Sequence, residues 1–293
     1  MPADAPIRRA APPSAGWAAL RRVLGEPLGL LGLVLVLVVV LGAIFADWLT
    51  IYDPIKMLPR DRFQAPSFLH LLGTDHLGRD LFSRVLHGGR IALTLALSAT
   101  GAALAIGAVL GLGAGYGPRW LDNVMLLLFD AIRSFPTVML ALALAILVGR
   151  SLWTVFLVVI IVNAPAYGRI IRTQTITLKG AEFVLASRSV GARAVRVLAI
   201  HILPNLIGPV LILACMDIPV VITIEAGMSF LGLGVPPPAP SWGTILSEGQ
   251  NYISDSPWPS IAGGIPLILS TLGFTFLGEA LRDVIDPRLR ATA

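Results

Sequence analysis

Long runs of apolar residues alternate with shorter polar segments along the chain. The runs are Pro27–Leu49 and, roughly, Ile91–Tyr116, Leu121–Val148, Leu152–Ile171, Leu206–Gly227 and Pro259–Leu281. About 20 consecutive apolar residues are enough for a helix to cross the hydrocarbon layer of a bilayer, which is roughly 30 Å thick. Because backbone amides in lipid need internal hydrogen-bond partners, each run must be helical. The pattern therefore predicts an all-α membrane protein with six transmembrane helices.

The first apolar run could be confused with a signal peptide, because several arginines precede it. The apolar core of a signal peptide has only about 7–15 residues, whereas this run extends from Pro27 to Leu49. We therefore expect an uncleaved first span that follows a tail of residues 1–26.

The composition agrees with a membrane protein, since 56% of the residues are apolar and 13% are charged. A soluble domain would carry about 25% charged residues. The net charge of +5 is compatible with nucleic-acid binding, but a mean hydropathy of +0.82 makes that interpretation secondary. Cys215 is the single cysteine, so neither a disulfide framework nor a cysteine metal site is expected. No metal-binding spacing is found among His70, His76, His87 and His201.

The loops between the spans indicate the orientation of the chain. The segment Arg169–Asn205 is rich in basic residues, whereas Met228–Trp258 contains no Lys or Arg. Because basic residues concentrate on the cytoplasmic side, we expect the first segment inside, the second outside and both termini in the cytoplasm. One segment that is external in this scheme, Thr50–Arg90, runs against the rule. Its basic residues are Lys56, Arg60, Arg62, Arg79, Arg84 and Arg90.

The cytoplasmic segment, at about 172–205, is unusually long for a connection between two helices, which commonly takes about 2–8 residues. Within it, Ala181–Gly191 has the pattern of a short amphipathic helix, and Ala192–His201 that of a second helical piece. Gly191 can adopt a left-handed conformation, so the two pieces can meet at a sharp angle. The apolar side of the first piece can lie on the bilayer surface or dock into a groove of another protein, and spacing alone favours neither.

This segment resembles the cytoplasmic signature of permease subunits of binding-protein-dependent ABC importers, and in particular the second permease subunit of dipeptide and oligopeptide systems. That signature reads Glu-Ala-Ala, three residues, Gly, nine residues, Ile-x-Leu-Pro. The chain departs from it at Leu185, which stands in place of the glutamate, and at Ser187, which stands in place of the second alanine. Glu182 matches a glutamate that is common in the peptide subgroup. The resemblance implies ATPase contacts at Glu182, Leu185, Ala186, Ser187, Arg188, Gly191 and Pro204.

Three further segments are similar to the same subfamily and extend the resemblance over nearly the whole chain. They are Gly73–Asp80, Ser229–Pro237 with Ser241-Trp242-Gly243, and Leu281–Asp283 with Asp286–Leu289. The first reads as a polar turn whose Asp and Arg side chains pair with each other, with substrate contact as the alternative. The second suits a stiff external loop that carries a re-entrant or surface-lying piece, with contact to a substrate-delivery protein as the alternative.

The resemblance implies a type I ABC importer permease fold in the bacterial inner membrane. Its parts would be a first helix with an external segment at 27–90, a five-helix core at 91–281 and a tail at 282–293. It also implies a homologous second permease subunit, two cytoplasmic ATPase subunits that bind ATP and Mg, and an external solute-binding protein, with no cofactor in this chain. The implied substrates are dipeptides or oligopeptides, although similar permeases handle nickel, glutathione or opines.

Polar residues within the apolar runs are candidates for a translocation path. A lone charge in lipid costs several kcal/mol, so these residues should face the bundle or each other. Asp130 and Arg133 have the spacing of an i,i+3 ion pair, which is the structural alternative to a role in the path. The candidates are Asp130, Arg133, Ser134, Asn163, Asp217 and Glu225.

Span two also carries Gly107, Gly111 and Gly115, and this four-residue spacing predicts close packing against a second helix. No Gly-x-x-x-x-Gly-Lys-Ser/Thr loop and no nucleophile–base arrangement occurs in the sequence, so we expect a transport subunit and not an enzyme. The competing class is a secondary transporter driven by an ion gradient, which would show inverted repeats. No such repeat is evident.

Overall fold

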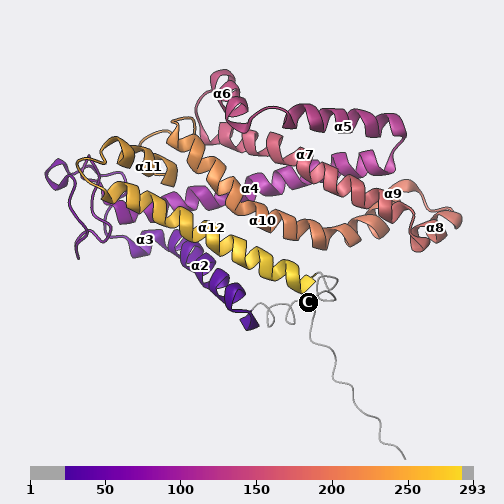
Figure 1. Ribbon diagram of the computed structural model, residues 1–293, viewed down its shortest axis with the longest axis horizontal. Helices are drawn as coiled ribbons and strands as arrows, with labels where there is room; N and C mark the ends of the chain where they lie inside the picture. The colour runs from indigo at the N-terminus through magenta and orange to yellow at the C-terminus, as the bar shows by residue number, and fades with distance from the viewer. Residues whose placement is uncertain (1–23, 286–293) are drawn as a thin grey trace, which may run out of the picture.

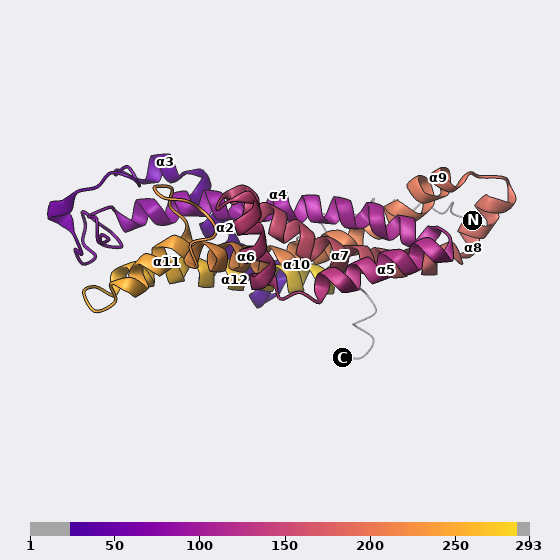
Figure 2. The same cartoon turned by 90° about the horizontal axis from the view of Figure 1, so that it is seen from above.

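The computed structural model describes residues 24–285, which form an elongated helical bundle (Figures 1 and 2). Of the expected cytoplasmic tails, residues 1–23 and 286–293 lie outside the described part. One end of the bundle holds helix α11 and residues 50–80, and the opposite end holds helices α8 and α9 (Figure 1). We call these the α11 end and the α8 end.

The described residues form helices joined by turns and loops, and their one β-bridge joins Thr74 to Asp80. The helices are α2 (Pro27–Ile44), α3 (Ala46–Leu49), η1 (Pro59–Asp61), α4 (Leu81–Tyr116), α5 (Arg119–Arg133), α6 (Thr137–Val148), α7 (Leu152–Lys179), α8 (Glu182–Ser189), α9 (Ala194–Arg196), η2 (Val197–Ile202), α10 (Leu203–Phe230), α11 (Trp242–Asn251) and α12 (Trp258–Ile285).

Five helical stretches of the described chain are long and apolar enough to cross a bilayer. They are Pro27–Ile44, Leu81–Tyr116, Leu152–Lys179, Ala194–Phe230 and Trp258–Asp283. A sixth crossing is possible only if α5 and α6 together make one span, and these two helices meet at 88°.

The prediction of a continuous third span over Leu121–Val148 is therefore wrong. The break lies between Arg133 and Thr137, and Pro136 precedes the first residue of α6. Proline has no amide hydrogen, and it disfavours the helical conformation in the residue before it. Pro136 lies within the predicted run, but the sequence gave no indication that the two halves turn almost at right angles.

Two other boundaries also differ from the prediction. Helix α4 begins at Leu81, ahead of the predicted Ile91, so the boundary at residue 90 falls inside a helix. Helix α7 continues to Lys179 and takes up the first part of the cytoplasmic coupling loop, the segment predicted at about 172–205. In both cases polar residues extend the apolar run, because a helix keeps its internal hydrogen bonds where it leaves the lipid.

The glycine ridge of α4 packs directly against the backbone of α7, as the spacing predicted. A Cβ atom added to Gly107 would lie 2.7 Å from the carbonyl oxygen of Ala164, and one added to Gly111 would lie 2.5 Å from that of Gly168. Small residues that let helix backbones approach in this way are a common means of association in membranes. Helices α4 and α7 therefore form the most closely associated helix pair of the described bundle.

A similar contact joins the first and last helices of the described chain. Helices α2 and α12 lie side by side (Figures 1 and 2). A Cβ atom on Gly32 would lie 2.6 Å from the backbone nitrogen of Leu277, and one on Gly273 would lie 2.9 Å from the Cβ of Leu35. A glycine on each helix thus lets α2, near the start of the described chain, pack closely against α12, at its end.

Candidate functional site

The α8 end contains the segment for which the sequence predicts ATPase contact. Val184 is the fully buried residue of α8, and it packs in a cluster with Val197 and Ile202. Phe183 and Leu185 are nearly half exposed, at 45% and 47%, and Val190 after the helix is 88% exposed. Helix α8 therefore presents apolar side chains that no described residue covers.

The remaining predicted coupling residues lie around this surface. Glu182, Ala186, Arg188 and Pro204 are exposed, and Ser187 is half-buried. Gly191 has φ +84, so the left-handed conformation predicted for it is confirmed. Its amide donates to the carbonyl of Arg188 at 2.9 Å, which ends α8 and turns the chain toward α9.

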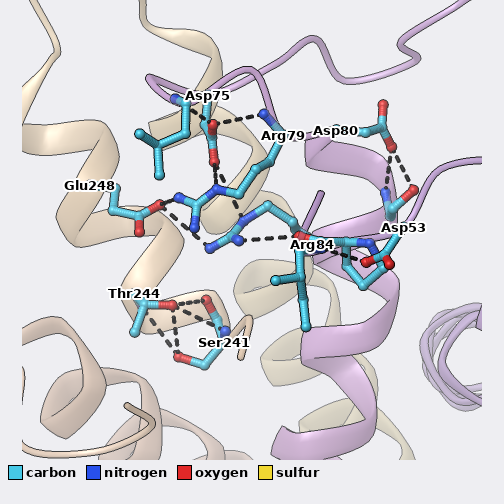
Figure 3. A network of polar contacts seen from close by, with 12 residues as sticks. Asp53, Asp75, Arg79, Asp80, Arg84, Ser241, Thr244 and Glu248 are labelled. Carbon is cyan, nitrogen blue, oxygen red and sulfur yellow. Dashed lines mark hydrogen bonds and ion pairs between the residues drawn. The ribbon is translucent and has the colours of Figure 1, made fainter. Parts of the chain in front are cut away.

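A cluster of buried charges at the α11 end joins the loop before α4 to α11 (Figure 3). Arg79 donates through Nε to Asp75 Oδ2 at 2.6 Å and through Nη2 to Glu248 Oε2 at 2.7 Å. Arg84 places Nη2 3.5 Å from Glu248 Oε2 and Nε 3.6 Å from Asp75 Oδ2. Asp75 and both arginines are almost completely buried. The self-pairing predicted for this turn is confirmed, and it extends to α11.

Helix α11 is also anchored through Trp242. The indole Nε1 donates to the carbonyl of Val85 at 2.9 Å. The ring lies over Gly88 and Gly89 of α4, where an added Cβ would come within 3.2 Å of it. Glycine at these two positions thus lets α11 pack closely on the first turns of α4.

Three of the six basic residues that opposed the charge rule, Arg79, Arg84 and Arg90, form ion pairs with acids in this region. Arg90 donates to the carbonyl of Ala43 at 2.6 Å and pairs with Asp47 at 2.9 Å, and His87 Nε2 lies 3.1 Å from the same carboxylate. Arg90, and to a smaller extent His87, hold the pKa of the Asp47 carboxyl below its usual range. Because Arg79, Arg84 and Arg90 are bound to acids, they are weak indicators of orientation.

The same region brings three potential metal ligands together, since ligand atoms of Asp75, His76 and Glu248 lie within 4.8 Å of one another. Both carboxylates already hold guanidinium groups, and a cation would have to displace those positive charges. The His76 ring stacks on Tyr252 with 4.7 Å between centroids, and burial lowers the pKa of this imidazole. The donor set therefore suits an ion-pair cluster beside a neutral histidine.

Three of the residues predicted for the path, Asp130, Arg133 and Ser134, lie at the break between α5 and α6. Asp130 forms an ion pair with Arg169 of α7, and not with Arg133 as its local spacing suggested. The two side chains of this pair are 63% and 42% exposed. Arg133 is exposed and has no partner among the described residues, and the Ser134 hydroxyl donates to the carbonyl of Ala131 at 2.7 Å. Charged groups thus lie on an open face of the bundle, next to a bend in an apolar helix pair.

A cavity of about 400 Å³ lies directly beyond this bend, between α6, α7 and α10. Its polar residues are Thr137, Asn163 and Thr223, and the rest of its lining is apolar. A volume of this size is within the range of pockets that hold small molecules. Of the predicted path residues, Asn163 lines this cavity.

Residues 107–291 match the protein family described as the binding-protein-dependent transport system inner membrane component. The chain belongs to this family. Residues 14–66 match a second description, the N-terminal transmembrane domain of oligopeptide transport permease C. Together the two matches confirm the resemblance read from the signature, and with it the all-α, type I ABC permease fold.

Named relatives cover nearly the whole of this permease. The dipeptide transport system permease protein DppC of Alkalihalophilus pseudofirmus is 36% identical over 93% of the chain and 90% of its own length. The di/tripeptide transport system permease protein DppC of Pseudomonas aeruginosa is 37% identical over 89% of the chain and 88% of its own length. The glutathione transport system permease protein GsiD of Pectobacterium atrosepticum is 35% identical over 92% and 90%. The chain is a membrane permease subunit and not an enzyme.

The other two path candidates of the permease lie apart from the bend. Asp217 is half-buried in α10. Glu225 is fully buried, and its Oε1 accepts a hydrogen bond from Ser229 at 2.7 Å, while the Ser229 hydroxyl accepts one from the amide of Val235 at 3.1 Å. This carboxyl braces the loop after α10, and the structure does not bring it to the cavity or to an open face.

Sequence reasoning missed three partners in these sites, namely Arg169, Glu248 and His201. Arg169 was read only as a marker of the cytoplasmic side, although a cation so close to an apolar run could have suggested a partner in another span. Glu248 was read as an external acid, and the lack of basic residues in its own loop was the signal that its partner lies elsewhere. His201 carries a bond to Ser187, and nothing local in the sequence indicates it.

Proposed function

We propose that this chain is one of two permease subunits of an ATP-driven importer of short peptides, in the bacterial inner membrane with both termini in the cytoplasm. ATPase subunits that bind ATP and Mg would dock on α8, and an external solute-binding protein would deliver the substrate at the α11 end. The observation that carries this proposal is the open apolar surface of α8 beside the Gly191 turn, at the end opposite the charge cluster.

The substrate class rests on the relatives. Those reported above are named for dipeptides, for di- and tripeptides and for glutathione, and glutathione is itself a tripeptide. A short peptide carries two charged termini and a polar backbone, so its passage needs polar groups at membrane depth. Nickel and opines are the alternatives that the sequence left open, and competition by them is part of the test below.

The path would run along the face that bears the break between α5 and α6. Exposed charges are not tolerated against lipid, so the Asp130–Arg169 pair and Arg133 need either water or a protein partner. A homologous permease that covers this face would enclose the charges and the neighbouring cavity. Motion of α8, driven by the ATPases, would then open the enclosed space to alternate sides.

The test is reconstitution of the chain with its partner permease, both ATPases and the binding protein in proteoliposomes. We expect uptake of a labelled dipeptide that requires ATP and persists when ionophores collapse the ion gradients. Excess unlabelled dipeptide should compete, whereas nickel and an opine should not. Uptake that stops with the ionophores and ignores ATP would instead indicate a secondary transporter.

Two controls separate this chain from its partners. The purified chain alone should show no ATPase activity above a sample without protein. A variant that lacks residues 182–196 should lose co-purification with the ATPases. If the ATPases still co-purify in full with that variant, α8 is not their anchor on this chain.

A further inference from the structure

The helix that follows the coupling segment is continuous from the α8 end into the bundle. Helices α9, η2 and α10 together form one stretch, Ala194–Phe230, of 37 residues. At 1.5 Å per residue such a stretch extends over about 55 Å. Anything that displaces its first turns therefore acts on a long lever that reaches the cavity at Thr223.

The first turns of this lever contain a π-helix, η2, over Val197–Ile202. The amide of Leu203 donates to the carbonyl of Leu198, five residues earlier, which is the π-helical pattern. Within η2, the His201 carbonyl accepts a hydrogen bond from the side-chain amide of Asn205 at 2.6 Å. Single π-helical turns inside α-helices occur frequently at functional sites.

The side chain of His201 reaches back to α8. Its Nε2 lies 3.1 Å from the hydroxyl of Ser187, and its ring lies 6.3 Å from that of Phe183, tilted by 57°. Among the described residues, this is the one side-chain hydrogen bond that joins α8 to the stretch that follows it. The connecting turn at Gly191 has no atom within 4 Å of the place where a Cβ would stand, so packing does not hold the turn itself.

We propose that His201 is a positioning residue that transmits displacement of α8 to α10 through its hydrogen bond with Ser187. The proposal rests on the proposed function, since it assumes that α8 receives the motion of the ATPases. Ser187 stands in place of the second alanine of the signature, which has no hydroxyl to offer, and with the nine-residue spacing after Gly191 His201 stands in place of its isoleucine. Both ends of this hydrogen bond are therefore positions where the chain differs from the signature.

The transport test compares Ser187→Ala, His201→Ala, the double variant and His201→Gln in the reconstituted importer. A neutral hydrogen bond shifts an equilibrium by about two- to twelvefold. We expect either single change to lower the peptide taken up per ATP hydrolysed by about that factor, and the double variant to be no worse than the singles. His201→Gln keeps a side-chain nitrogen at a similar reach and should restore part of the ratio.

The matched control is Ser98→Ala on α4. The Ser98 hydroxyl donates to the carbonyl of Thr94 in its own helix at 2.6 Å. Ser98 is exposed, and it is far from α8 in the sequence. It makes the same chemical change without touching the pair. Ser187→Ala transport that equals that of Ser98→Ala, or losses from Ser187→Ala and His201→Ala that simply add, would overturn the proposal.

A second measurement does not depend on transport. Hydrogen exchange of the α8 amides in the full chain should become about two- to twelvefold faster in Ser187→Ala and stay unchanged in Ser98→Ala. Unchanged exchange in Ser187→Ala would overturn the proposal even if His201→Ala failed to fold. If the wild-type importer shows no ATP-driven uptake while the exchange result holds, the proposed function fails and the structural tie between α8 and α10 stands.

Discussion

Replacing Gly191 by valine should disable transport without unfolding the permease. Gly191 has φ +84, and an L-residue in this left-handed region costs about 1–2 kcal/mol. Because no atom lies within 4 Å of the new Cβ, the cost comes from the backbone alone. An energy of this size makes the observed turn about 5–30 times less populated relative to other conformations, and α8 would leave its place on Val197 and Ile202.

Two variants isolate the cause. Gly149→Val introduces the same side chain at a second open glycine of positive φ, +95, in the loop between α6 and α7. Gly149 has ψ 167, in a region that is essentially restricted to glycine, so this variant should lower the melting temperature at least as much and yet leave coupling intact. Gly191→Asn changes the coupling turn itself, but asparagine tolerates the left-handed region far better than valine does, so it should keep most of the transport.

The assay is peptide uptake per ATP hydrolysed in proteoliposomes, with the amount of inserted protein determined by quantitative blotting. Gly191→Val should lose most of its uptake while Gly149→Val retains it. Full uptake by inserted Gly191→Val would refute the role of the turn. Equal defects in Gly191→Val and Gly191→Asn would show that something other than backbone conformation is at work.

Three further predictions concern packing, the charge cluster and orientation. Gly111→Ala places a Cβ 2.5 Å from the α7 backbone and should destabilise the bundle by about 1–3 kcal/mol, measured as a lower melting temperature in detergent. The control is Gly113→Ala, whose Cβ meets nothing within 4 Å and which should be neutral or slightly stabilising. Glu248→Gln leaves two buried guanidinium groups with one carboxylate and should lower the free energy of unfolding by about 1–3 kcal/mol. Proteolysis at the α11 end should become faster. Asp255→Asn replaces an exposed acid nearby and should change neither the stability nor the rate of proteolysis. In a background free of other cysteines, a cysteine in place of Arg188 should react with a membrane-impermeant thiol reagent only from the cytoplasm, and one in place of Asp255 only from outside. Labelling of both positions from one side would contradict the predicted topology.

Much of the fold could be predicted from the sequence because lipid imposes a simple rule on it. Apolar runs long enough to cross the bilayer must be helical, so five of the six predicted spans correspond to continuous helical stretches of sufficient length, although helices α4 and α7 extend beyond the runs. The ridge at Gly107 and Gly111 predicted close packing for a local reason, since residues four apart lie on one face of a helix. The turn at Gly191 was likewise readable, because few other residues adopt a positive φ.

What the sequence did not reveal depends on contacts between distant segments. Asp130 had a cation three residues away that fits local helix geometry, yet it pairs with Arg169 on another helix. Arg79 reaches Glu248, 169 positions further along the chain. Such choices follow from how α4, α7 and α11 pack, and spacing within one helix carries no information about that.

The two ends of the permease differ in how firmly they are held, and this difference bears on the mechanism. At the α11 end, buried ion pairs and the Trp242 indole hold α11 on the first turns of α4. At the α8 end, one side-chain hydrogen bond and the single buried side chain of α8, that of Val184, hold α8 against η2. Because breaking a buried charge cluster costs more than breaking a single neutral hydrogen bond, a load applied at α8 should displace α8 and the start of α10 before it loosens α11 from α4. Movement should then concentrate where α10 borders the cavity near the α5–α6 bend, so that the fixed α4–α11 unit serves as the frame against which the path opens.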